Sequence, residues 1–271
     1  MMDAQKKKLD FAKPPVEEVV LSVLFKSLNG LLAPHLGEIW QEFKKDGFTR
    51  ILEQPPVMPT METFPDQNPG AQFNINVPDL PRIWFIHEND SQILQVQRDR
   101  FTFNWRKTEL YPKYPGFSVI FERFESFYNR FGEMIKNLEI GPMTPAQYEL
   151  SYIDQLMHGE GWNTLSDMGQ IYNIFVGSQQ SNSFWNGAEL IIFQTSFPIQ
   201  ALQGRLHLAI SNRVKSPQQR QTLQTDFTVR GFPERSESEM DLWFKSARDQ
   251  IREKFASMFT EDIQIHVWER K

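Results

Sequence analysis

The spacing of hydrophobic side chains predicts an alternation of strands and helices over the first 155 residues. Val16 to Phe25 is an apolar run that follows two prolines, which is typical of a buried strand. From Leu32 to Phe43, and again from Ile120 to Leu138, apolar residues recur every three or four positions, which predicts amphipathic helices. Further strands are predicted over 82–87, 93–105 and 147–155. This β-α-β-β-α-β order is that of a ferredoxin-like split unit.

The rest of the chain predicts three more strands and a final helix. The strands lie over 190–197, 205–211 and 223–229, and the middle one alternates apolar with polar side chains. An apolar stripe from Met240 to Phe259 predicts a long helix. A helix-grip-like C-terminal half has such elements. The expected fold class is α+β, with a mainly antiparallel sheet and long amphipathic helices.

Composition divides the chain into an arm and two halves. Residues 1–13 are rich in lysine and are expected to form a flexible basic arm. The halves, 14–155 and 156–271, are expected to pack as one unit, because no linker-like composition separates them. Segment 53–81 has seven prolines, which cannot donate a regular ladder of hydrogen bonds. We expect an irregular connection over the surface there; a partner-binding arm is the alternative.

The predicted strand 93–105 changes phase within its length. Leu94 and Val96 are apolar at even positions, whereas Phe101, Phe103 and Trp105 are apolar at odd positions. A strict two-residue period cannot bury both sets on one face, so 97–100 must contain a bulge or a tight turn. We expect a bulge, because Arg-Asp is a poor sequence for a two-residue hairpin loop.

Charge and composition exclude several classes of protein. The 271 residues carry a net charge of −5 and no cysteine, which excludes disulfide scaffolds and thiolate chemistry. The acidic balance argues against broad, non-specific binding of nucleic acid. No apolar run reaches 18 residues and no targeting signal is visible, so a cytoplasmic protein without membrane association is expected.

Catalytic signatures are absent from the sequence. It has no G-x-S-x-G, H-E-x-x-H, Walker or dinucleotide-binding motif. The loop His158-Gly159-Glu160 brings two potential ligands together, but one His-x-Glu pair is weak support for a metal site. We therefore expect no catalytic residue, no metal and no cofactor, and an enzymatic function is uncertain and disfavoured. The alternative is a ligand or enzymatic pocket between the sheet and the C-terminal helix, lined by Glu17 or Glu18 and by His207.

Two adjacent carboxylates, Glu17 and Glu18, interrupt the first apolar strand. Since side chains alternate along a strand, one of the two must point inward or into a groove. A buried carboxylate is costly unless a cation pairs with it. We expect a structural ion pair with an arginine of a neighbouring strand; a tuned acid or base is the alternative.

The segment 95–114 gathers cationic and aromatic side chains. On strand parity, Arg100, Asn104 and Arg106 share one face, while the aromatic residues take the other. Such a face could hold a carboxylate or a phosphate. The candidate binding residues are Arg98, Arg100, Asn104, Arg106, Tyr111 and Tyr114. A half-buried structural strand and an RNA-binding strand are the alternatives.

Three motifs give the chain a resemblance to other proteins. They are the start Pro14-Pro15-Val16-Glu17-Glu18-Val19, the stretch from Leu94 to Arg106 (LQVQRDRFTFNWR), and Tyr111-Pro112-Lys113-Tyr114. Together with a short Trp-containing tail, they resemble a sporadically distributed bacterial family of uncharacterised proteins. The resemblance implies a bacterial cytoplasmic protein, and it carries over no activity or cofactor. From the residues we expect a non-enzymatic interaction protein for an acidic protein partner or an anionic ligand.

Overall fold

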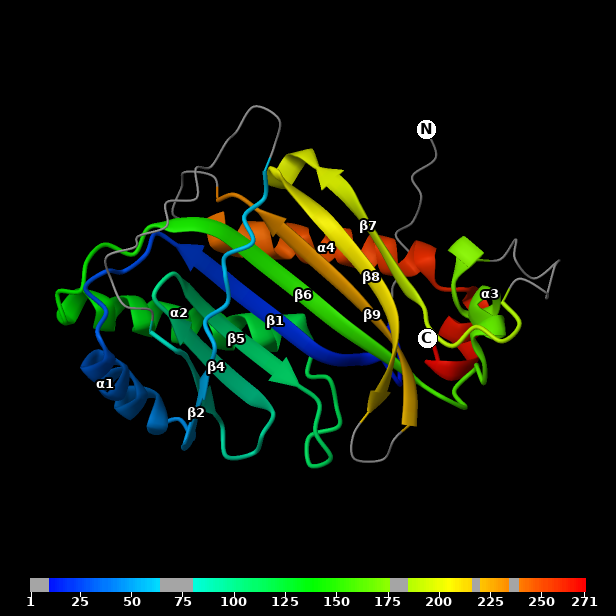
Figure 1. Cartoon of the computed structure of the whole chain (residues 1–271), viewed down its shortest axis with the longest axis horizontal. Coiled ribbons are helices and arrows are strands. Elements are labelled where there is room, and N and C mark those ends of the chain that lie inside the picture. Colours follow the sequence, from blue (N-terminus) through cyan, green and yellow to red (C-terminus); the bar gives the residue numbers. More distant parts are fainter. Residues whose placement is uncertain (1–9, 64–79, 176–184, 216–219, 234–238) are drawn as a thin grey trace.

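The chain folds around a single antiparallel sheet. The computed structural model describes residues 10–63, 80–175, 185–215, 220–233 and 239–271. These residues form a nine-stranded sheet, with the strand order β2-β3-β4-β5-β1-β6-β9-β8-β7 (Figure 1). The strands are β1 (Val16–Phe25), β2 (Arg50–Gln54), β3 (Arg82–Ile86), β4 (Gln92–Gln97), β5 (Arg100–Arg106), β6 (Pro145–Met157), β7 (Ile192–Ile199), β8 (Gly204–Lys215) and β9 (Arg220–Gly231).

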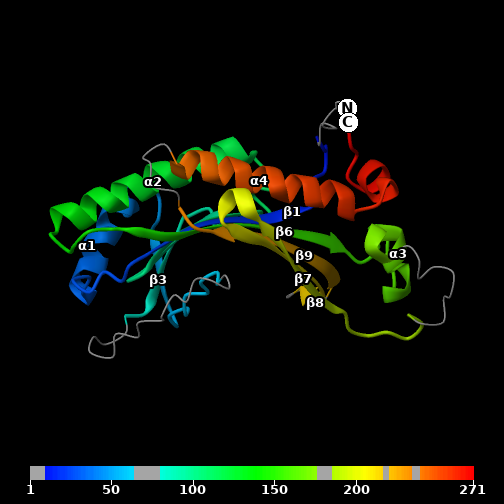
Figure 2. The same cartoon turned by 90° about the horizontal axis from the view of Figure 1, so that it is seen from above.

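Helices cover one face of this sheet. They are α1 (Ala33–Lys44), α2 (Phe117–Asn137), the single turn α3 (Met168–Ile171) and α4 (Glu239–Met258). Figure 2 shows α2 and α4 side by side along the same face. In the part of the chain that the structure describes, no helix has both the length and the apolar character needed to cross a bilayer.

The two halves of the sheet are connected in the same way. β1 and β6 pair at its centre. After β1 the chain passes through α1 to the edge strand β2 and returns strand by strand to β5, which pairs with β1; after β6 it passes through α3 to the other edge strand, β7, and returns to β9, which pairs with β6. Each half then ends in a long helix. The pattern of connections therefore begins again at β6, and the expected division into 14–155 and 156–271 stays a prediction.

The core between the sheet and the helices is rich in phenylalanine. Phe101 of β5 stacks on Phe131 of α2, with the ring centroids 4.9 Å apart. Phe124 of α2 meets Phe244 of α4 edge-on at 5.2 Å, which joins the two helices. These four side chains are completely buried. The predicted α+β class with an antiparallel sheet is thus confirmed.

The predicted β-α-β-β-α-β order of the first half is wrong in its number of strands. Residues 50–54 form an additional strand, β2, and the predicted strand 93–105 is two strands. Both neighbours of β1, which are β5 and β6, are antiparallel to it, and the ferredoxin-like split unit stays a prediction. β2 gave no alternating pattern because almost all of its side chains are exposed. The helix-grip-like description of the C-terminal half stays a prediction.

The bulge expected over 97–100 is also wrong. Arg98 and Asp99 form the two-residue turn of a hairpin between β4 and β5. The carbonyl groups of this turn accept hydrogen bonds from the end of β1 and the chain after it. Phe25 N–H donates to Asp99 O at 2.9 Å, and Leu28 N–H donates to Arg98 O at 2.8 Å. Contacts from a distant segment therefore support a turn that its own sequence does not favour.

The hairpin explains the change of phase. Leu94 lies opposite Phe103, and Val96 lies opposite Phe101. All four side chains are completely buried on the helical face. Phe101 and Phe103 are thus buried under α2, where their rings contact Phe131 and Phe127.

Most of the expected basic arm lies outside the described residues, which begin at Asp10. The described part is bound to the C-terminal tail. Phe11 forms an isolated bridge with Arg270, and its ring packs edge-on against Phe255 and Trp268. Lys13 forms an ion pair of 2.6 Å with Glu269.

Replacement of Phe103 by Ala should destabilise the protein by about 3–5 kcal/mol, because it leaves a cavity under α2. Phe103 is completely buried, and its ring centroid lies 5.6 Å from that of Phe127. Urea unfolding at equilibrium measures the change. The control is Leu242→Ala on the exposed side of α4, where 60% of the residue is accessible; it should change stability by less than about 0.5 kcal/mol. Equal effects of the two changes would contradict this packing.

Candidate functional site

The face of the sheet opposite α2 and α4 is lined with polar side chains, many of which are buried. Two pairs of hydroxyl groups bridge neighbouring strands with hydrogen bonds of 2.8 Å: Ser22 with Thr102, and Ser151 with Thr228. We call this surface the polar face. Its buried polar residues are Ser22, Gln95, Gln97, Thr102, Asn104, Gln147, Ser151 and Gln224.

A stretch of the proline-rich segment lies across the polar face. Residues 55–63, which we call the strap, cross in front of the central strands in Figure 1 and lie on the side away from the helices in Figure 2. Two glutamines of the sheet hold its backbone. Gln97 donates to Val57 O and accepts from Val57 N–H, both at 2.9 Å. Gln147 donates to Thr60 O at 2.9 Å and accepts from Glu62 N–H at 2.8 Å.

Glu62 fixes the strap to the second half of the sheet. Its carboxylate accepts a hydrogen bond from Arg205 at 2.6 Å and lies 2.5 Å from Nε2 of His207. The side chain is only 5% exposed. Burial alone would raise the pKa of Glu62, but the hydrogen bonds from His207 and Arg205 outweigh it and lower the pKa. The charged carboxylate is therefore the form that the fold stabilises.

The predicted residues Asn104 and Arg106 lie on the polar face, but both form hydrogen bonds with other residues of the chain. Asn104 donates to Glu18 at 2.6 Å and accepts from Gln95 at 2.7 Å. Arg106 donates through Nε to the backbone carbonyl of Asp90 at 2.6 Å. Asp90 has a φ of +62°, a conformation that is uncommon for a non-glycine residue. Arg106 therefore braces a turn.

The two adjacent carboxylates separate as the alternation requires. Glu18 points to the polar face, where burial raises its pKa against the opposing effects of Asn104 and Arg106. Its hydrogen-bond partner is thus an amide, with the expected arginine acting at longer range. Glu17 pairs instead with Lys107, at 3.3 Å. His207 is bound to Glu62. Glu17, Glu18 and His207 therefore do not line one common pocket.

Three arginines gather at the opposite end of β5, where the β4–β5 hairpin turns. Arg82, Arg98 and Arg100, which we call the arginine cluster, each have a buried Nε atom without a hydrogen-bond partner. Burial lowers the pKa of Arg82, and the charge of Arg100 lowers it further. Among the described residues, no carboxylate forms an ion pair with any of the three.

Neutral groups orient Arg82 within this cluster. Its Nη1 donates to Gln95 at 3.1 Å, and its guanidinium lies over the ring of Trp84, 5.4 Å from the centroid. An anion bound here would supply the acceptors that the buried Nε groups lack. Sequence reasoning identified Arg98 and Arg100 but missed Arg82, which lies next to the proline-rich segment.

The two predicted tyrosines lie at the other end of β5, away from the cluster. Tyr111 is 48% exposed. Tyr114 is largely buried, and its hydroxyl shares a hydrogen bond of 3.1 Å with that of Tyr152. Burial raises the pKa of Tyr114. The six predicted binding residues therefore do not form one site.

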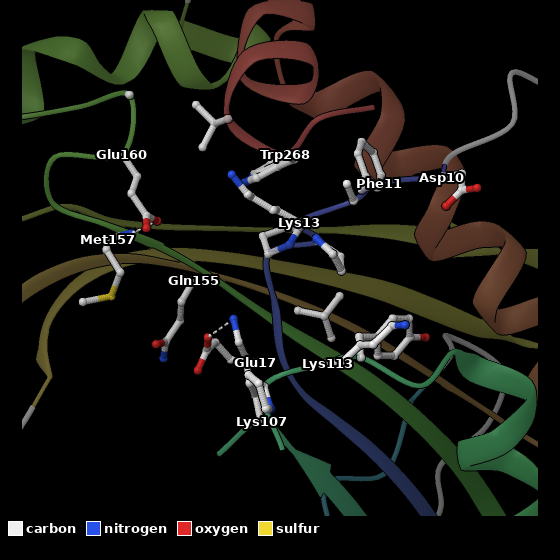
Figure 3. A pocket seen from close by; sticks show the side chains of 18 of the residues that line it. Asp10, Phe11, Lys13, Glu17, Lys107, Lys113, Gln155, Met157, Glu160 and Trp268 are labelled. Carbon is white, nitrogen blue, oxygen red and sulfur yellow. Dashed lines mark hydrogen bonds and ion pairs between the residues drawn. The ribbon is translucent and has the colours of Figure 1, made fainter. Parts of the chain in front are cut away.

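A large open pocket lies at this second end of the sheet (Figure 3). Its volume is about 1100 Å³, and it is lined by the N-terminal segment, the loop before α2, the end of β6 and the C-terminal tail. Lys13, Lys107, Lys113 and Lys271 line it, together with Glu17. Lys13 and Lys107 are paired with carboxylates, which reduces the positive charge available to a ligand.

Asp154 was missed by the sequence reasoning, although a signal was present. Tyr148, Leu150, Tyr152, Asp154 and Leu156 have the same parity along β6, so a carboxylate stands among core positions. Asp154 is 3% exposed and its Oδ1 is buried without a partner. Burial raises its pKa to about 8, and the charges of Asp226 and Glu17 add to the effect.

The loop His158-Gly159-Glu160, which was weak support for a metal site, is held by ordinary structural contacts. The ring of His158 packs edge-on against Trp162, with 5.6 Å between the centroids. Glu160 accepts a hydrogen bond of 3.1 Å from the backbone of Met157. In the described parts of the chain, no group of three or more His, Asp or Glu side chains is arranged to hold a metal ion.

Comparisons of the chain with protein-family models, with curated proteins and with solved structures found no match. The resemblance to a bacterial family stays a prediction. Any function must therefore follow from the arrangement of the side chains.

Replacement of Glu62 by Gln should destabilise the protein at pH 7 by about 1.5–3 kcal/mol, the usual contribution of hydrogen bonds to a charged group. Because the folded-state pKa of Glu62 is lowered, this stability is present above the unfolded pKa and is lost as the pH falls through the folded one. Urea unfolding from pH 7 to about pH 3 should show the two proteins converging.

The matched control is Glu253→Gln, a change on the exposed side of α4. It should leave the unfolding curve unchanged at every pH. A constant gap between wild type and Glu62→Gln across the whole pH range would contradict the ionic role of Glu62.

Proposed function

We propose that the protein is a non-enzymatic binding protein that holds an anionic group of a protein partner or ligand at the arginine cluster. One observation carries the proposal: Arg82, Arg98 and Arg100 keep buried Nε groups without acceptors. A buried donor without a partner costs about 1–3 kcal/mol, so an anion that accepts from these groups gains that energy on binding.

The surroundings of the cluster favour binding over chemistry. Guanidinium groups stay charged at every physiological pH, so they hold an anion but do not transfer protons. Arg82 and Arg100 repel each other, and a bound anion would relieve that repulsion. The strap passes close by, since Gln97, which holds Val57, lies opposite Arg100 in the hairpin.

The RNA alternative lacks its physical basis in this arrangement. A basic-aromatic strand binds RNA by stacking bases on exposed rings. Phe101 and Phe103 are completely buried under α2, and Trp105 is 5% exposed. The polar face of β5 therefore presents arginine, threonine and asparagine without the aromatic residues that the RNA alternative needs.

The double variant Arg82→Gln/Arg100→Gln should weaken anion binding by roughly tenfold or more, since each charged hydrogen bond contributes about 1.5–3 kcal/mol. Two probes serve: inorganic phosphate by calorimetry, and a fluorescent decapeptide of glutamate by anisotropy. Binding to the wild type should weaken as salt rises. Phosphate binding alone indicates a small anionic ligand, and preference for the peptide indicates an acidic partner.

A control with the same charge change is Arg123→Gln/Lys136→Gln, on the exposed side of α2. It should bind both probes like the wild type. Arg106→Gln should lower the unfolding midpoint without changing either affinity, since Arg106 braces the turn at Asp90. If neither probe binds the wild type, or if the control loses as much affinity as the cluster variant, the proposal fails.

A further inference from the structure

A small cavity adjoins the large pocket, on the helical side of the sheet. Its volume is about 120 Å³ and it lies between β6, α4, the loop before α2 and the N-terminal segment. The polar groups that line it are Tyr114, Tyr152, Asp154, Arg248 and Arg252. We call it the Asp154 cavity. Phe11, Pro14, Pro15, Val16 and Tyr114 also line the large pocket, so the two spaces share walls.

Asp154 forms one end of this cavity. The residue is 3% exposed, and its Oδ1 has no hydrogen-bond partner. Its side chain also forms no ion pair among the described residues. Buried carboxyl groups normally have a partner, and one without costs stability. A ligand that donates a hydrogen bond to Oδ1 of Asp154 would therefore gain stability on binding.

Two arginines form the other polar wall. Arg248 and Arg252 lie one helical turn apart on α4 and both line the cavity. Arg248 is 3.9 Å from Asp249, its only carboxylate contact among the described residues, and Arg252 has no such contact there. Although Asp154 lines the same cavity, neither arginine pairs with it. The charges of both guanidinium groups are therefore available to an anionic group in the cavity.

A pair of tyrosines lines the same cavity. Tyr114 and Tyr152 share a hydrogen bond of 3.1 Å between their hydroxyl groups. Both hydroxyls feel the negative charge of Asp154 and the positive charge of Arg248. The cavity therefore combines a carboxyl group, two guanidinium groups and two hydroxyls that interact with both Asp154 and Arg248.

We propose that the Asp154 cavity binds a small zwitterion of the amino-acid class, with its ammonium group at Asp154 and its carboxylate at Arg248 and Arg252. A zwitterion supplies, in one molecule, a donor for Asp154 and a carboxylate for the two arginines. The volume is well below the roughly 300–1,000 Å³ of pockets for drug-sized ligands, which selects a small molecule. Ile251 and Phe255 add an apolar wall for its side chain.

Binding of the ammonium group should release a proton. Asp154 is mostly protonated at pH 7 in the free protein, because its pKa is about 8. A cation beside it lowers that pKa, so the carboxyl group ionises as the ligand binds. The charged and titratable groups that act on Asp154, or on which it acts, are Glu17 on β1, Tyr152 on β6, Asp226 on β9, Tyr172 after α3 and Tyr114 before α2.

The experiment is calorimetric titration of the full chain at pH 7 with alanine, valine and leucine. Propionate, which lacks the ammonium group, and ethylamine, which lacks the carboxylate, are the matched controls. We expect at least one amino acid to bind at least roughly tenfold more tightly than either control. Titration in two buffers of different ionisation enthalpy should show close to one proton released per ligand bound.

Three variants test the assignment. Asp154→Asn should lose binding by roughly tenfold or more and abolish the proton release, while the protein stays folded because a costly buried acid is removed. Arg252→Gln should lose affinity for the amino acid and keep the proton release of any residual binding. Arg123→Gln, on the exposed side of α2, should bind like the wild type.

Amino-acid binding at the Asp154 cavity does not depend on anion binding at the arginine cluster. The variant Arg82→Gln/Arg100→Gln should therefore leave amino-acid binding unchanged. The proposal is overturned if no amino acid binds, if propionate binds as tightly as alanine, or if Asp154→Asn retains full affinity.

Discussion

The pairing of β1 with β6 is the interaction on which the rest of the structure depends. It joins two halves of the same topology into one sheet, with nine registered pairs from Val16 to Phe25. Since both strands are at the centre, each also carries a second antiparallel neighbour, β5 or β9. The helices that end the two halves can then cover one common core, which Phe124 and Phe244 close between them.

The helices cover one face of the sheet and leave the polar face without a helical layer. A nine-stranded sheet with helices on only one face leaves the side chains of the other face to be covered by water or by another segment. Here the strap covers part of it, held by Gln97 and Gln147 and by the carboxylate of Glu62. The prolines of the strap leave few N–H groups, so glutamine side chains replace a regular ladder. The arginine cluster is the part of this face where cations have no such partner.

Local sequence patterns predicted the helices and strands that pack on the core. Contacts between distant parts of the chain determine the features that the sequence did not predict. The stripe of α2 and the alternation of β8 are visible in the sequence because burial imposes a period on both. The Arg98–Asp99 turn is not visible, because hydrogen bonds from the chain after β1 support it. Glu62 has no sequence signal either, since its partners are 143 and 145 residues away. Asp154 could have been found, as a carboxylate at core parity in β6.

The buried Nε groups of the arginine cluster are proposed to donate hydrogen bonds to an anion. The most direct measurement is a ¹⁵N–¹H spectrum of the chain labelled on arginine side chains, with the three resonances assigned by single Arg→Lys changes. Addition of inorganic phosphate or of the glutamate peptide should shift the Nε–H resonances of Arg82, Arg98 and Arg100 downfield and slow their exchange with water. The Nε–H signal of Arg106, already bound to Asp90 O, should stay in place. If the three resonances do not move while those of exposed arginines do, the cluster is not an anion site.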